Sequence, residues 1–127
     1  MSGGFLTTFS GPTTANVLGG VVHYQVPTGG TSTTFVVENA TVYYESPVTM
    51  TKGTCYSRGI IDCSTTPISK TITDLELTTG GGYRDPDNTT TVSNGIELVG
   101  CRISDLTAFD IARNFVLTIG NPTILLS

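Results

Sequence analysis

Apolar and polar residues alternate along much of this chain, a pattern typical of β-strands that bury one face. The clearest alternation runs from Val22 to Val26, where His23 and Gln25 separate the apolar side chains. In the run that ends ITDLEL, the alternation slips once between Ile72 and Leu75, and a β-bulge would absorb that slip. We expect strands within residues 17–26, 34–50, 68–77, 89–93, 96–103 and 115–126.

Glycine, proline and asparagine divide these runs. Asn94-Gly95 is the strongest hairpin signal in the chain, because both central residues of a type I′ turn need positive φ. It predicts a hairpin that joins residues 89–93 to residues 96–103. The stretch SDLTAFDIAR predicts one short helix, with Ser104 and Asp105 available as caps.

About eight short strands separated by such turns favour an all-β fold, a single-domain β-sandwich or jelly roll with one short helix. Residues 17–127 would form the domain, and residues 1–16 an extended N-terminal arm carrying Phe5, Leu6 and Phe9. The alternative is a short β-solenoid. It is indicated by the echo between ITDLEL (72–77) and ISDLTA (103–108), which would then mark successive rungs.

Composition supports the β assignment, because threonine makes up nearly a fifth of the 127 residues and only 13% are charged. Six scattered basic residues and a net charge of −4 argue against a nucleic-acid partner. Neither a signal peptide nor an apolar run of about 18 residues is visible, so we expect neither export nor a membrane span. Three cysteines without C-x-x-C spacing favour reduced thiols, although a Cys55–Cys63 bridge stays open beside Cys101.

The stretch GGGYRDPDNTTTVSNG is the first candidate for a metal site. Asp85 and Asp87 are spaced as an EF-hand loop requires, but Thr90 occupies the glycine position and Ile96 the position of the bidentate glutamate. An irregular oxygen site that includes Asn88 stays open beside the simpler interpretation, a polar turn. We expect a loop that faces solvent or a partner, without a tightly bound metal.

Other chemistry finds little support in the sequence. His23 is the only histidine, so a nucleophile such as Cys55 or Cys101 would have to reach it from elsewhere in the fold. Structural zinc sites need closely paired ligands, which this chain lacks. Asp74 and Glu76 share one face of an expected strand, which suits acid–base chemistry, but a solvated strand face is the better interpretation. We expect no enzymatic activity and no cofactor.

Together, the threonine- and glycine-rich, charge-poor β composition with reduced thiols resembles the small structural proteins of tailed-phage virions, above all head decoration or cement proteins. The resemblance implies a homotrimer on the capsid exterior, made in the host cytoplasm, that clamps neighbouring major capsid subunits without touching nucleic acid or membrane. Broad contact and strand addition would provide the grip. The expected interface consists of Phe5, Leu6, Phe9, Tyr83, Arg84, Asp85 and Asp87.

A tail-fibre or adhesin-type module that recognises a host saccharide or protein is the competing function. Its loops, such as residues 78–91, would form the contact surface. Tyr83 is the only aromatic residue in that loop and tryptophan is absent from the chain, so sugar stacking has little to use. A pilin-like subunit would need a processed leader, and an enzyme ranks last.

Overall fold

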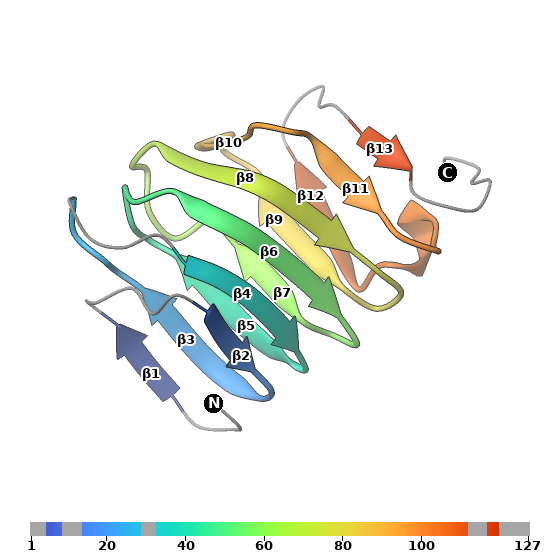
Figure 1. The fold of residues 1–127 in the computed structure, drawn as a ribbon, viewed down its shortest axis with the longest axis horizontal. Helices are drawn as coiled ribbons and strands as arrows, with labels where there is room; N and C mark the ends of the chain where they lie inside the picture. The colour runs from blue at the N-terminus through green and yellow to red at the C-terminus, as the bar shows by residue number, and fades with distance from the viewer. Residues whose placement is uncertain (1–4, 9–13, 29–32, 112–116, 120–127) are drawn as a thin grey trace.

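The computed structural model describes residues 5–8, 14–28, 33–111 and 117–119, and these residues form a β-solenoid of two parallel sheets (Figure 1). Sheet A contains, in spatial order, β1 (Phe5–Thr8), β3 (Gly20–Tyr24), β5 (Ala40–Tyr44), β7 (Ile60–Asp62), β9 (Gly82–Asp85) and β12 (Ala108–Ile111). Sheet B contains β2 (Thr14–Val17), β4 (Thr33–Glu38), β6 (Met50–Tyr56), β8 (Lys70–Leu77), β11 (Ile96–Leu98) and β13 (Leu117–Ile119), and β10 (Thr90–Val92) also pairs with β8.

The chain alternates between the two sheets. One turn of the solenoid, a rung, contributes a strand to sheet A and then one or two strands to sheet B. Val22, Val42, Ile61 and Tyr83 are register partners on successive strands, and one rung therefore takes about 20 residues. Every pairing among the described strands is parallel. The all-β expectation and its solenoid alternative are confirmed, whereas the sandwich or jelly roll is wrong. Alternation reports one buried face but not the direction of the neighbouring strand.

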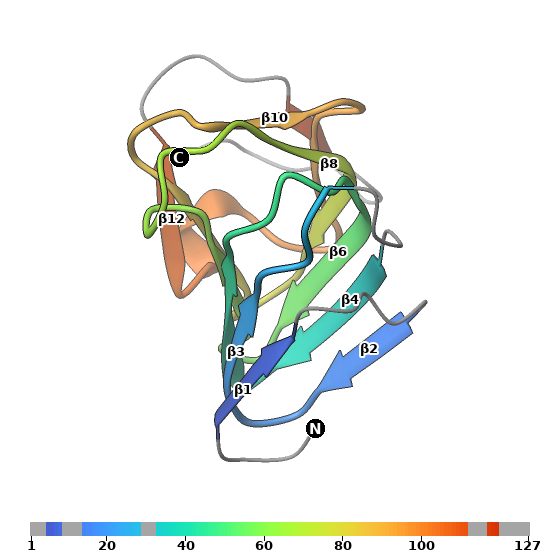
Figure 2. The same ribbon diagram turned by 90° about the vertical axis from the view of Figure 1, so that its left-hand side faces the viewer.

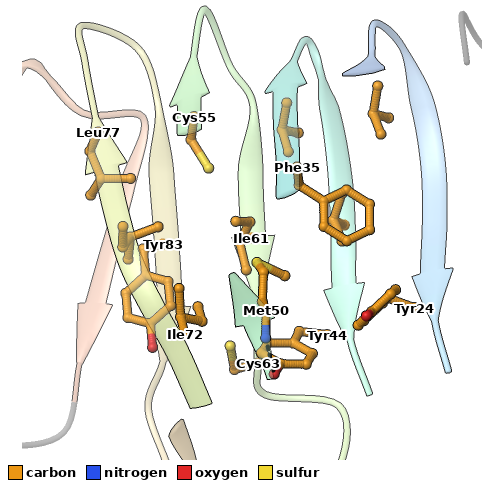
Figure 3. Close-up of a cluster of buried hydrophobic side chains, with 14 of the residues drawn as sticks. Tyr24, Phe35, Tyr44, Met50, Cys55, Ile61, Cys63, Ile72, Leu77 and Tyr83 are labelled. Atoms are coloured by element: carbon orange, nitrogen blue, oxygen red, sulfur yellow. Dashed lines mark hydrogen bonds between the residues drawn. The ribbon is translucent and has the colours of Figure 1, made fainter. Parts of the chain in front are cut away.

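The core fills the space between the sheets, which lie closest at one end of the rungs and separate toward the other (Figure 2). Small buried side chains such as Ala40 and Cys55 lie near the narrow end. Tyr24, Tyr44 and Met50 fill the wide end (Figure 3), where the Tyr24 ring lies 5.7 Å from the Tyr44 ring. The Tyr24 and Tyr44 rings thus occupy the part of the interior where the two sheets stand farthest apart.

Short corners close the narrow end; they are the turns from β4 to β5 at Asn39, from β6 to β7 at 57–59, and from β8 to β9 at 78–81. Asn39, Ser57 and Gly80 have positive φ, which turns the chain tightly. The corners also bond to each other: the Asn39 N–H donates to the Ser57 carbonyl at 2.9 Å, and the Ser57 N–H to the Thr79 carbonyl at 3.2 Å. Backbone bonding therefore continues from rung to rung around the corner.

Polar groups at the wide end are satisfied by nearby backbone. The Tyr44 hydroxyl accepts the Met50 N–H at 3.1 Å and lies 2.6 Å and 2.7 Å from the Val48 and Thr71 carbonyl oxygens. Burial raises the pKa of Tyr44 and lowers that of Lys70, whose ammonium group donates to two carbonyls of the loop before β8. These bonds tie the longer loops to the core.

Three sequence-based expectations about elements need correction. Within residues 1–16, the described segments are the first strands of both sheets, β1 beside β3 and β2 beside β4, and not an arm separate from the domain. Asn94-Gly95 does form a tight turn, with φ of 78° at Gly95, but β10 and β11 both pair with β8 in parallel and form no hairpin. The Asn-Gly pair thus predicted the turn correctly, but it does not determine whether the two strands that the turn joins pair with each other.

The expected helix is also wrong. Its described part consists of a three-residue 3₁₀ turn, Ile103–Asp105, and strand β12; residues 112 and 113 lie outside the described residues. Pairing of β12 with β9 outweighs the weak helical periodicity of so short a segment. The echo that suggested a solenoid does not mark equivalent positions either, because ITDLEL lies on β8 of sheet B and ISDLTA covers the 3₁₀ turn and the start of β12 in sheet A.

Candidate functional site

A groove of about 410 Å³ lies on the outer face of sheet B, over β6, β8 and the turn that leads into β11. Its volume is within the usual range of small-ligand sites. We refer to it as the sheet B groove. It is lined by Lys52, Asp74, Leu75, Glu76, Asn94, Gly95 and Glu97.

Strand alternation directs the charged side chains of the sheet B groove outward. On β8, Leu75 and Leu77 are buried in the core, so Asp74 and Glu76 project from the opposite face. Parallel register then places Lys52 of β6 beside Asp74, and Glu97 of β11 beside Glu76. Three consecutive rungs thus contribute to one surface.

Two of the three carboxylates have partners within the groove. The Lys52 ammonium lies 3.2 Å from Oε2 of Glu76, and Nδ2 of Asn94 donates to Oδ1 of Asp74 at 2.8 Å. Among the residues whose side chains the structure describes, none bonds to the Glu97 carboxylate. One lysine against three carboxylates leaves the groove with two uncompensated negative charges.

The turn at Asn94 and Gly95 forms one wall of the groove and is fixed to β8. The Asn94 N–H donates to the Thr73 carbonyl at 3.0 Å, and the Gly95 N–H to the Val92 carbonyl at 3.1 Å. Positive φ at Gly95 makes the tight reversal possible. The backbone therefore holds the Asn94 amide in place over Asp74.

The loop residues expected to form a surface do not lie together. Tyr83 and Asp85 point into the core and are only 1% and 4% exposed, so neither is available to a partner. Arg84 projects outward from sheet A, and Asp87 is exposed in the turn after β9. Tyr83 and Asp85 are thereby removed from the expected interface, because both lie on strand β9 and not in a loop.

Asp85 has a structural function in this turn. Its Oδ1 accepts the Thr89 N–H at 2.9 Å, and its Oδ2 accepts the Thr90 N–H at 3.1 Å. Both oxygens thus satisfy backbone donors of the turn, as expected of an aspartate in a polar turn. Asn88 has a positive φ of 55° in the same turn.

The other expected interface residues belong to the N-terminal segment. Phe5 and Leu6 lie on β1, whose register partners are Val21 and Val22 of β3. Phe9 lies outside the described residues. The structure therefore places β1 at the sheet A side of the first rung, on the other sheet from the groove.

The outer face of sheet A carries a second row of polar side chains. Arg84 lies 3.0 Å from Asp62 and 3.6 Å from Asp110, which links three rungs. On neighbouring rungs the His23 ring stacks on Tyr43, with 4.9 Å between the centroids, and Nδ1 of His23 lies 2.7 Å from Oε1 of Glu45.

Glu45 accepts several hydrogen bonds on this face. Burial of its carboxylate opposes ionisation, but hydrogen bonds from Thr65, Gln25 and His23 outweigh that effect and lower the pKa of Glu45. The bond from Gln25 measures 3.0 Å. His23 therefore stands in a bonded surface row, in agreement with a structural histidine.

Cysteines and histidine are not brought together. Cys55, Cys63 and Cys101 are free and buried between the sheets, whereas His23 faces outward. Burial raises the pKa of Cys55 and of Cys63 to about 12, which keeps these thiols protonated at neutral pH. The Cys55–Cys63 bridge, which the sequence left open, is not formed.

The described residues contain neither a metal-binding cluster nor a helix that could cross a membrane. No group of three or more histidine, cysteine, aspartate or glutamate side chains there is arranged to hold a metal ion. No helix within the described ranges has the length and apolar character that crossing a membrane requires. Comparison of the chain with models of known families, with curated proteins and with solved structures gave no match.

Local sequence indicates one part of the sheet B groove and not the rest. Asp74 and Glu76 were recognised as sharing a strand face, because period-two alternation needs only local sequence. Lys52, Asn94 and Glu97 join them through parallel register across rungs. No local pattern reports that register, which is why the groove could not be anticipated.

Proposed function

We propose that this chain is a non-enzymatic binding module of the tail-fibre or adhesin kind, which holds a saccharide in the sheet B groove. The observation that carries the proposal is the groove itself, because it gathers four of the chain's 16 charged residues at one hollow of an otherwise hydroxyl-rich surface. Function is thereby assigned to a defined surface and not to the loop that the sequence favoured.

The groove offers the two kinds of polar group that a sugar needs. Hydroxyl groups both donate and accept hydrogen bonds, and the groove supplies acceptors in Asp74, Glu76 and Glu97 and donors in Lys52 and Asn94. Ion pairing and the fixed turn hold several of these groups in place before a ligand arrives. Such preorganisation reduces the entropy lost on binding.

Binding without catalysis fits the bonding of the carboxylates. Glycoside hydrolysis uses one carboxyl group as the acid and a second as base or nucleophile. Here Glu76 faces the Lys52 ammonium and Asp74 accepts from the Asn94 amide. Both are engaged in holding the groove together, which favours recognition over proton transfer.

Capsid clamping stays a prediction from composition. In that prediction the chain is a homotrimeric virion protein and its partner is the major capsid protein. A clamp would be favoured by a broad apolar surface. The large apolar side chains most exposed in the described part of the chain are Leu18, Ile68 and Val99. Leu18 follows β2 and Val99 follows β11, with β4, β6 and β8 between them, so they form no common patch.

A glycan array tests the proposal. The full chain should bind a subset of immobilised glycans, and Glu97→Trp, which fills the sheet B groove, should weaken that binding by at least about tenfold. Thr41→Trp is the matched control, because it places the same tryptophan side chain on the outer face of sheet A. An array without a bound glycan, or equal loss in both folded variants, would contradict the proposed function.

A further inference from the structure

Asn94 occupies the single place in the sequence where glycine follows asparagine. Asparagine is one of the chemically thermolabile residue types. Glycine has no side chain, so nothing shields the backbone nitrogen of Gly95 from the residue before it. Asn94 is also exposed, in the turn between β10 and β11. An electrophilic carbon, Cγ of Asn94, and a backbone nucleophile therefore lie one residue apart at a surface that water reaches.

We propose that Asn94 is a site of spontaneous covalent modification, at which the chain converts asparagine into aspartate and isoaspartate. The Gly95 nitrogen attacks Cγ of Asn94, a bond forms between these two atoms, and the bond from Cγ to Nδ2 breaks. Nδ2 leaves as ammonia together with the proton that the Gly95 nitrogen gives up. A water molecule then opens the resulting succinimide ring at either of its carbonyl carbons, which yields aspartate or isoaspartate. The modification does not depend on which ligand the sheet B groove holds.

Asp74 slows this reaction in the folded chain. Its Oδ1 accepts the hydrogen bond from Nδ2 of Asn94 at 2.8 Å, which holds the leaving group on the amide. Negative charge also develops on Oδ1 of Asn94 during the attack, and the Asp74 carboxylate beside it disfavours that charge. The Gly95 N–H donates to the Val92 carbonyl at 3.1 Å, so the nucleophile has to leave this bond before it can attack. Conversion should accordingly be slower in the folded chain than in the unfolded chain.

Conversion changes both the charge and the backbone of the groove wall. Aspartate at position 94 puts a carboxylate where the amide now donates to Asp74, so that repulsion replaces a hydrogen bond. Isoaspartate lengthens the backbone by a methylene group just before β11, whose residue Ile96 is the register partner of Leu75. Both products therefore loosen the attachment of this turn to β8, and with it one wall of the sheet B groove.

The experiment follows the full chain by peptide mapping and mass spectrometry during incubation at mildly alkaline pH, with chromatographic separation of aspartate and isoaspartate products. We expect Asn94 to convert before the other asparagines and to yield both products, because direct hydrolysis of the amide would yield aspartate alone. Asn39 is the internal control: it is also exposed in a tight turn, but alanine follows it. A parallel incubation in urea gives the rate for the unfolded chain.

Substitutions of Asp74 test its effect on the rate. Asp74→Ala should accelerate conversion of Asn94 by about fivefold or more, which is the rate equivalent of one hydrogen bond. Asp74→Asn keeps an acceptor oxygen and removes only the charge, so we expect a smaller acceleration. Asp87→Ser, which removes an equal charge from the exposed turn after β9, should change the rate by less than about twofold because solvent screens distant surface charges. Circular dichroism would establish that each variant is folded.

Three results would overturn the proposed modification: conversion of Asn39 as fast as that of Asn94, aspartate as the sole product at position 94, or an intact Asn94 in buffer after the chain in urea has converted completely. Equal rates in the unmodified chain and in folded Asp74→Ala and Asp74→Asn would overturn the role of Asp74. Both products at position 94, formed faster in urea and faster in Asp74→Ala, would support the modification and its control by Asp74.

Discussion

Gly59 at the corner between β6 and β7 should be the glycine that this fold can least replace. A Cβ atom built at Gly59 would lie 1.9 Å from the Val37 carbonyl oxygen and 2.4 Å from the Val37 carbonyl carbon. Carbon–oxygen contacts normally fall near 3.3 Å, so the two rungs would have to separate by roughly 1.4 Å. Backbone atoms on both sides of the contact leave no flexible side chain that could give way.

The cost follows from what this separation breaks. The bond that crosses this gap is that of the Asn39 N–H to the Ser57 carbonyl at 2.9 Å. Loss of this backbone bond at about 1 kcal/mol, together with overpacking of 1–3 kcal/mol, gives about 2–4 kcal/mol for Gly59→Ala. Lower entropy of the unfolded alanine chain offsets at most about 1 kcal/mol of this.

Gly100 provides the matched control, because it tests backbone conformation without a close contact. It has a φ of 65°, and no atom lies within 4 Å of a Cβ built there. Gly100→Ala should therefore cost only the left-handed strain of about 1–2 kcal/mol, less the same entropic gain. Urea denaturation followed by far-UV circular dichroism would give both free energies of unfolding. The reasoning is refuted if Gly59→Ala costs less than about 1 kcal/mol, or no more than Gly100→Ala.

Three further predictions concern single groups. Burial raises the pKa of Cys55 and of Cys63 to about 12. In the folded protein these thiols should therefore react with a thiol reagent at pH 8 roughly a thousandfold more slowly than a free cysteine. Rapid labelling of the native protein would contradict this prediction. Burial opposes ionisation of Glu45, but the hydrogen bonds to its carboxylate, including that from His23, outweigh the effect of burial and lower the pKa of Glu45. The ionised carboxylate therefore contributes its full stabilisation above the pKa of the unfolded state, and this stabilisation disappears as pH falls through the pKa of the folded state. Glu45→Gln should accordingly reduce the loss of stability between about pH 5 and pH 3, and an unchanged pH profile would count against the bonded carboxylate. Tyr44→Phe should cost about 1–3 kcal/mol in urea denaturation, because it leaves buried backbone groups unpaired, and a neutral effect would show that water replaces the hydroxyl.

Local sequence identified part of the core but not all of it, because Tyr83 and Asp85, expected at a surface, are buried. The alternation from Val22 to Val26 predicts that Val22, Tyr24 and Val26 share a buried face, and the structure buries all three. It could not decide between a sandwich and a solenoid, because both bury one face of each strand. The deciding fact is that Val22 pairs with Val42 in parallel, a contact between residues a whole rung apart.

A better signal for the solenoid was present in the chain, and it lay in the corners. Asn39, Gly59 and Gly81 recur about 20 residues apart at the return from sheet B to sheet A. Gly81, like Gly59, has no room for a side chain, since a Cβ would lie 2.2 Å from the Cys55 carbonyl oxygen. Recurrence of tight-turn residues at rung spacing indicates stacking more directly than the resemblance of two apolar hexapeptides.

The same corners connect stability to the proposed binding. Lys52, Asp74 and Glu97 reach the sheet B groove from three rungs, and only parallel register brings them together. The corners at 57–59 and 78–81 follow β6 and β8 directly, and their cross-rung hydrogen bonds fix where each strand ends relative to its neighbour. A substitution at Gly59 that displaces one rung should therefore disturb the ion pair between Lys52 and Glu76 from a distance, although no groove atom has been changed. Binding and corner packing depend on one geometric quantity, the register between rungs, because a solenoid builds its surface from rows of residues that no single strand contains.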